Sequence, residues 1–138
     1  MQFTVREKAS GTPIGSAITV FERFRELGNA DQESFWVLGM NAGNQEILNE
    51  CLFKGGMVIT TVDVRIVFKR LLMAGCVSFI VIHNHPAGDV KPSVADEKIT
   101  QRLKEGADIL GLYFLDHIII GESYYSFQES GLLYHIAH

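Results

Sequence analysis

The sequence is poor in cysteine, has no excess of basic residues and contains no long apolar run. Its two cysteines, Cys51 and Cys76, lie apart in apolar surroundings and form no Cys-x-x-Cys pair. This pattern argues against a disulfide framework and against a thiolate metal site. We therefore expect both cysteines to be buried, reduced thiols of a cytoplasmic protein.

The charge balance and the hydropathy argue against two further classes of protein. The formal net charge of −4 disfavours electrostatic binding of nucleic acid, which normally needs a basic face. The local cluster of Arg65, Lys69 and Arg70 is interpreted as a solvated helix face. No stretch approaches the roughly 18 apolar residues of a membrane span, and the first residues include no apolar segment of signal-peptide length. We expect no membrane association.

The composition that remains is that of a globular domain. A chain of 138 residues with 47% hydrophobic residues can form one compact domain with a real core. Residues 1–15 contain Gly11, Pro13 and Gly15 and predict an irregular lead-in, so the domain is expected over residues 16–138. The sequence has no internal repeat and no low-complexity tract.

Apolar spacing and turn residues predict three helices and six strands. The helices are expected over 16–27, 62–74 and 94–110, and the strands over 35–40, 45–53, 77–82, 112–115, 117–120 and 124–127. Gly43 is expected to supply the positive φ of a hairpin turn at 41–44. A hairpin combined with a strand–helix–strand crossover implies an α/β (α+β) fold, in which a mixed β-sheet is flanked by helices.

The most informative segment is residues 83–100, His-Asn-His-Pro-Ala-Gly-Asp-Val-Lys-Pro-Ser-Val-Ala-Asp-Glu-Lys-Ile-Thr. Because side chains alternate along a strand, His83 and His85 project to one side and Asn84 to the other. Asp96 follows at the start of the next helix. Two imidazoles and one carboxylate make a three-ligand zinc site whose fourth position is open to water, as in catalytic zinc sites. The hypothesis is therefore hydrolysis.

Ser93 and Asp96 also fit a purely structural role. Ser-x-x-acid ahead of an apolar helical period is close to a capping box, with Ser93 as the N-cap. The structural and the metal-binding roles are compatible, because a carboxylate in the first turn of a helix lies at the positive end of the dipole and stays ionised.

A hydrolytic site also needs a base that accepts a proton from water. Glu33, just ahead of the apolar strand, is the candidate by its position at a strand start. Spacing alone does not distinguish Glu33 from Asp31, Glu46 or Glu50.

The motifs carry a family resemblance. The block His-x-His-Pro-x-Gly with Pro-Ser-x-x-Asp resembles the signature of the JAMM (MPN+, JAB) metalloproteases. The longer frame, with His-Asn-His-Pro-x-Gly and a later Asp-His-Ile-Ile-Ile-Gly, resembles the RadC-like branch, from about Ser16 to Leu133. The resemblance implies a cytidine-deaminase-like sheet fold with Zn²⁺ held by His83, His85 and Asp96.

The resemblance also implies a chemistry. Glu33 occupies the place of the general base, and Ser93 that of the serine that orients the water or helps to stabilise the oxyanion. The implied reaction is the hydrolysis of an amide or isopeptide bond in a protein or peptide substrate.

The sequence also departs from the RadC-like pattern. Val64-Arg65-Ile66 stands where RadC-like proteins usually have Pro-Arg-Glu, and no counterpart of their N-terminal helix-hairpin-helix region is found. We therefore expect the DNA-repair association to transfer poorly and direct DNA binding to be disfavoured. His117, beside Asp116, is interpreted as a structural, hydrogen-bonded residue. Two other functions stay open, a metal-dependent nuclease or repair accessory factor and a non-catalytic scaffold, as does a homodimer.

Overall fold

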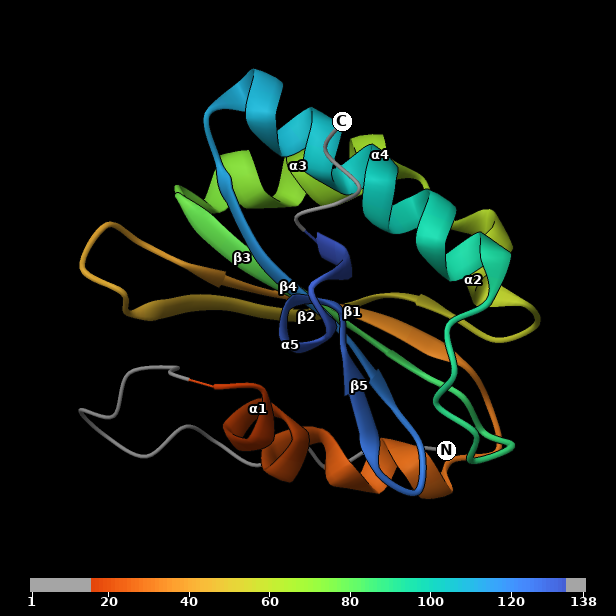
Figure 1. The fold of residues 1–138 in the computed structure, drawn as a ribbon. Helices are drawn as coiled ribbons and strands as arrows, with labels where there is room; N and C mark the ends of the chain where they lie inside the picture. The colour runs from red at the N-terminus through yellow and green to blue at the C-terminus, as the bar shows by residue number, and fades with distance from the viewer. Residues whose placement is uncertain (1–15, 134–138) are drawn as a thin grey trace.

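The computed structural model describes residues 16–133, in which five strands form one mixed sheet with helices on both faces (Figure 1). The strands are β1 (Ser34–Met40), β2 (Glu46–Lys54), β3 (Ser78–Asn84), β4 (Tyr113–Ile120) and β5 (Tyr124–Ser126). Their order across the sheet is β2-β1-β3-β4-β5. β3 and β4 run parallel, whereas the other neighbours are antiparallel. This is the mixed α+β fold that the sequence predicts, and the expected lead-in at 1–15 lies outside the described residues.

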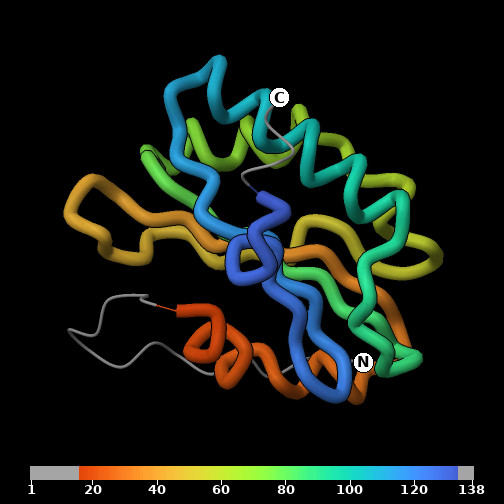
Figure 2. Tube along the Cα trace, viewed as in Figure 1, coloured from red at the N-terminus to blue at the C-terminus, as the bar shows by residue number. Residues whose placement is uncertain are grey.

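The helices divide between the two faces of the sheet. They are α1 (Ala17–Phe24), the 3-10 helix η1 (Arg25–Asn29), α2 (Val58–Thr61), α3 (Val64–Ala74), α4 (Val94–Leu110) and the short α5 (Phe127–Ser130). Figure 1 shows α1 below the sheet and α3 and α4 above it. The tube in Figure 2 follows the crossover from β3 through α4 into the parallel strand β4. Each face of the sheet therefore has its own apolar core.

The central strand β3 belongs to both cores. All seven of its residues are buried, because helices cover both sides of the sheet. Phe79 and Val81 pack in the core beneath α3 and α4, whereas Ile80 and Ile82 pack in the core against α1. The alternation of side chains along the strand therefore directs the residues at its end to opposite faces.

Two glycines end helices of the upper layer. Gly75 follows α3 with φ 78°, and Gly111 follows α4 with φ 74°. Both positions are left-handed, and glycine takes that conformation without a steric penalty from a Cβ.

The C-terminal strands differ from the prediction. Residues 112–115 and 117–120 do not form two strands, because β4 runs through both ranges. Its register against β3 shifts between Phe114 and Asp116, which leaves Leu115 as a bulge. A bulge interrupts the alternation of buried and exposed side chains and mimics a break between strands.

The hairpin turn is present, but its left-handed residue is not the glycine. Asn44 has φ 62°, whereas Gly43 does not have a positive φ. The side chain of Asn41 accepts hydrogen bonds from the backbone N–H groups of Gly43 and Gln45, at 2.9 and 3.0 Å. Asparagine tolerates the left-handed region, and these bonds hold the turn.

The first two predicted helices have different bounds. The helix expected over 16–27 is an α-helix only to Phe24 and continues as η1. The helix expected over 62–74 begins at Val64, where Asp63 caps it by accepting from the Arg65 N–H. The spacing of apolar residues continues through a change from α-helix to 3-10 helix and does not mark the first residue of a helix. The pattern therefore reveals neither difference.

Two short helices are not predicted at all. α2 and α5 have four residues each, too few for a helical period to be recognised. The strand expected over 124–127 accordingly ends at Ser126, whose side chain caps α5.

Two expectations concern the chain as a whole. Both cysteines are free, but only Cys76 is buried, and Cys51 is half-buried rather than buried. None of the helices in residues 16–133 combines the length and the apolar character needed to cross a bilayer.

Candidate metal centre

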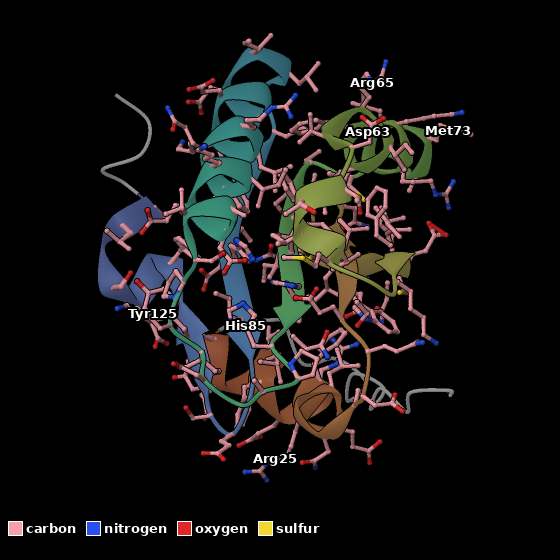
Figure 3. All side chains as sticks on the ribbon, turned by 90° about the vertical axis from the view of Figure 1, so that its right-hand side faces the viewer. Arg25, Asp63, Arg65, Met73, His85 and Tyr125 are labelled. Atoms are coloured by element: carbon pink, nitrogen blue, oxygen red, sulfur yellow. The ribbon has the colours of Figure 1, made fainter. Side chains whose placement is uncertain are left out.

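The end of β3 and the first turn of α4 bring His83, His85 and Asp96 together. His83 and Asp96 are fully buried, and the side chain of His85 is 17% exposed. One potential ligand atom from each residue lies within 4.8 Å of the others. In Figure 3, His85 lies between the end of β3 and the N-terminal end of α4. The strand and the helix thus supply the three side chains that the sequence motif singles out.

The ring of His85 is oriented for metal binding. Its Nδ1 lies 2.8 Å from the backbone oxygen of Asp89, a carbonyl that can only accept, so Nδ1 carries the proton. In its neutral form the ring presents the lone pair of Nε2, which faces Oδ2 of Asp96 at 3.1 Å. Two acceptors at this distance require a proton or a cation between them. A hydrogen bond from the other ring nitrogen to a carbonyl is the usual support of a metal-binding histidine.

The two carboxylate oxygens of Asp96 have different surroundings. Oδ2 accepts from the backbone N–H and the hydroxyl of Ser93, at 2.8 and 2.9 Å. Oδ1 lies 3.1 Å from Nδ1 of His83, but neither of these two buried atoms makes a hydrogen bond within the described residues. Buried polar atoms without partners are costly, and a cation would satisfy both. The donor set therefore fits a metal ion.

The electrostatics of the site also favour a cation. Burial acts to raise the pKa of Asp96, but the imidazoles of His83 and His85 and the Ser93 backbone N–H outweigh burial and hold that pKa far below its ordinary value. Burial acts to lower the pKa of His85, but the Asp96 carboxylate and the Asp89 carbonyl outweigh it and raise that pKa. Asp96 therefore keeps its negative charge, which favours a cation at the site.

Glu33 lies beside the three potential ligands. Its Oε2 accepts from the Val58 N–H at 3.1 Å, and its Oε1 lies 3.3 Å from Nε2 of His83. The two glutamates that spacing leaves as alternatives are bound elsewhere: Glu46 pairs with Arg23 and Glu50 with Arg70. Of these three glutamates, only Glu33 contacts the centre.

Asn84, between the two histidines, fastens the segment that carries Glu33. The fully buried amide accepts from the Ser34 N–H at 2.7 Å and donates to the carbonyls of Gln32 and Leu27, both at 2.9 Å. These bonds hold the backbone on both sides of Glu33. Sequence reasoning placed Asn84 on the opposite face from the histidines, as observed, but missed this role. Its only sequence signal is a buried-strand position occupied by an amide.

Ser93 is the N-cap of α4, and the capping box expected with Asp96 is present. The Ser93 hydroxyl accepts from the Asp96 N–H at 3.0 Å and donates to Asp96 Oδ2. The hydroxyl proton is therefore engaged with the side chain of a potential ligand. A role of Ser93 at a substrate oxyanion would require its release, and that role stays a prediction.

Thr100 links Asp96 to His117, a buried histidine outside the candidate ligand set. The Thr100 hydroxyl donates to the Asp96 backbone oxygen at 2.7 Å and lies 2.6 Å from Nδ1 of His117. Burial, and then the charge of His83, lowers the pKa of His117 to about 3, so this ring is neutral. His117 is hydrogen-bonded, as expected, but its partner is Thr100, whereas the neighbouring Asp116 bonds to Ser126.

Arg65 lies away from the centre. Its exposed guanidinium forms an ion pair with Asp63, at 2.9 Å, beside the N-terminus of α3. The structure therefore gives Arg65 a local role at the cap of this helix.

Comparison with known proteins identifies relatives of the chain. The model of the RadC-like JAB domain family matches residues 14–132. A UPF0758 protein of Flavobacterium johnsoniae is 46% identical over 107 residues, which cover 77% of this chain and 47% of that protein. UPF0758 protein YfjY of Escherichia coli is 41% identical over 109 residues, 78% of this chain and 68% of YfjY. A UPF0758 protein of Chlorobium chlorochromatii is 39% identical over 122 residues, 87% of this chain and 55% of the relative. The chain thus spans about half to two thirds of these relatives.

Proposed function

This chain belongs to the RadC-like JAB domain family, and we propose that it is a metal-dependent hydrolase that cleaves an amide or isopeptide bond in a protein or peptide. One observation supports this most directly. Nδ1 of His83 and Oδ1 of Asp96 are buried, face each other and have no hydrogen-bond partner within residues 16–133. A cation held between them would satisfy both atoms.

The proposed metal ion is Zn²⁺, held by His83, His85 and Asp96. Imidazole nitrogens and one carboxylate oxygen are ligands that suit zinc, and three protein ligands are typical of catalytic zinc sites. When bound, the ion would polarise the substrate carbonyl and lower the pKa of water.

Glu33 is the proposed general base. The Val58 N–H holds its Oε2, and the backbone on either side is held by Asn84, so Oε1, which contacts Nε2 of His83, stays directed towards the centre. In the proposed reaction Oε1 accepts the proton of the attacking water and later delivers it to the leaving amine. Ser93 would contribute to the oxyanion only through a hydroxyl released from Asp96.

Glu33→Gln tests this proposal, because it keeps the size and hydrogen bonding of the side chain and removes the base. We expect the variant to retain its zinc, measured by elemental analysis of protein purified without chelator. Turnover of a substrate found in peptide and isopeptide libraries should fall about 10²–10⁴-fold. Glu50→Gln is the matched control, because Glu50 is bound to Arg70 away from the centre.

Three outcomes would contradict the proposal in different ways. Normal turnover by Glu33→Gln would place the base elsewhere, and loss of zinc would make Glu33 a ligand. If no amide is cleaved while DNA is bound at physiological salt, the nuclease or repair-accessory function takes the place of the hydrolase.

A further inference from the structure

A groove of about 480 Å³ lies between α2 and α4. Its apolar lining includes Ile59 and Val62 on one side and Val94 and Ala95 on the other. Val94 is 67% exposed although it is apolar, so the groove offers apolar surface to solvent. A concave surface of this kind suits the side chain of a bound polypeptide.

Both walls of the groove begin at the metal centre. Val58, the first residue of α2, holds the carboxylate of Glu33 through its N–H. Ala95, on the opposite wall, directly precedes Asp96 in the first turn of α4. A chain lying in the groove would therefore have one end beside Glu33 and Asp96.

Two cations of α4 also line the groove. Lys98 and Arg102 are both exposed and lie four positions apart, so they are neighbours on one face of the helix. Like charges at this spacing destabilise a helix. Asp63 feels the positive charge of Arg102, but its carboxylate is bound to Arg65. In the part of the chain that the structure describes, neither Lys98 nor Arg102 forms an ion pair.

Another cation of the same helix shows the contrast. Lys104 forms an ion pair with Asp108 at 3.0 Å, four positions further along. The cation away from the groove thus forms an ion pair within its own helix, whereas the two in the groove form none among the described residues. Although the whole chain has a net charge of −4, the surface around Lys98 and Arg102 is locally positive and favours binding of acidic groups.

We propose that the groove binds an extended acidic segment of the polypeptide substrate, an inference that rests on the proposed hydrolase function. An apolar residue beside the cleaved bond packs on Val94 and Ala95, and two acidic residues further along bind Lys98 and Arg102. Four residues of helix rise about 6 Å, and alternate residues of an extended chain are about 6.8 Å apart. The two acids are therefore two positions apart. The apolar walls favour a peptide over a nucleic acid.

The binding test uses the full chain and does not depend on turnover. The probe is a short fluorescein-labelled peptide with a leucine followed by two glutamates two positions apart, and its anisotropy is measured with and without zinc. Lys98→Glu and Arg102→Glu should each weaken binding about threefold to fivefold, and the double variant about tenfold or more. Glu33→Gln should bind the peptide normally even if its turnover is lost. Failure of the groove is thereby distinguished from failure of the hydrolase.

Lys69→Glu is the matched control, because it makes the same charge change on the exposed surface of α3. It should alter peptide binding less than twofold, and a matched peptide with lysines in place of the glutamates should not bind. Equal weakening by Lys69→Glu and by the groove variants would overturn the proposal, because the effect would then reflect net charge. Binding of a labelled oligonucleotide but not of the acidic peptide would also overturn it. Circular dichroism of each variant checks that α4 is intact.

Discussion

Two buried aspartates differ in a way that separates a candidate functional site from a structural one. Asp96 and Asp116 each accept a hydrogen bond from a serine that caps a helix, Ser93 for α4 and Ser126 for α5. Both oxygens of Asp116 are used, because the Gln128 N–H donates to the second one at 3.0 Å. Oδ1 of Asp96 is instead left to face an imidazole.

The surroundings move the two pKa values in opposite directions. Burial raises the pKa of Asp116 to about 6, despite the hydrogen bonds from Ser126 and Gln128. At Asp96 burial acts in the same direction, but the two imidazoles and Ser93 outweigh it. Capping and burial are therefore common to both aspartates, and the facing histidines make the difference.

The largest expected effect is on zinc. Asp96→Asn should abolish stoichiometric zinc binding, because it removes the anionic ligand, while Asp116→Asn should retain about one zinc per chain. Elemental analysis of the two purified variants measures this directly. Equal zinc content in the two variants would contradict the prediction that Asp96, and not Asp116, is a zinc ligand.

Asn84 is a buried polar residue that adjoins the metal centre but is fully hydrogen-bonded, like Asp116. Asn84→Ala would leave the Ser34 N–H and two carbonyls without partners, so we expect a loss of about 3 kcal/mol or more in the free energy of unfolding. Ile82→Val, a truncation on the same face of β3, should cost only about 1 kcal/mol. Urea denaturation of the zinc-free proteins compares them. A small loss for Asn84→Ala would mean that its bonds to the Glu33 segment contribute little.

The free energy of unfolding should depend on pH through the titration of Asp116. Its folded pKa of about 6 lies above the ordinary value of 3.8, so between these pH values the folded state keeps a proton that the unfolded state releases. The contribution of this group to the free energy of unfolding is therefore present at low pH and is lost as the pH rises through 6, by on the order of 3 kcal/mol. The difference in free energy of unfolding between the zinc-free wild type and Asp116→Asn should show this fall. A difference that does not change from pH 4 to 6 would contradict it.

The smallest effects are expected at the two capping serines. Ser93→Ala and Ser126→Ala should each lower stability by about 1 kcal/mol, because each removes a cap and a hydrogen bond to a buried carboxylate. Only Ser93→Ala should also weaken zinc binding, by about tenfold, because Ser93 orients Asp96. Thermal melts of the zinc-free proteins and zinc titrations separate the two roles. Weaker zinc binding by Ser126→Ala as well would contradict a specific role of Ser93 in orienting Asp96.

The grouping of the three candidate ligands was predictable because its geometry is local. His83 and His85 need only the alternation of a strand, and Asp96 needs only the first turn of the following helix. The family resemblance, carried by the same motifs, is confirmed by the match over residues 14–132. The facing atoms of His83 and Asp96 could not be predicted, because they depend on how α4 is placed above β3.

Other features of the site depend on long-range contacts that spacing does not encode. Glu33 could be chosen over Asp31, Glu46 and Glu50 only through the family resemblance, and its anchoring by Val58 involves a helix too short to predict. The bonds of Asn84 join segments that pair only once the sheet has formed. Likewise, the bulge at Leu115 reflects the register between β3 and β4.

The position of β3 at the centre of the sheet also has a kinetic consequence. Asn84 and Ser34 are separated by 50 positions, whereas His85 and Asp96 are separated by 11. Closing the longer loop costs about 1 kcal/mol more in chain entropy, so we expect the ligands to assemble before the Glu33 segment docks. The single tryptophan, Trp36, donates to the Ser34 hydroxyl at 2.9 Å and reports on that docking. During refolding with Co²⁺, the cobalt absorption should therefore appear before the tryptophan fluorescence changes, and the reverse order would contradict this sequence of events.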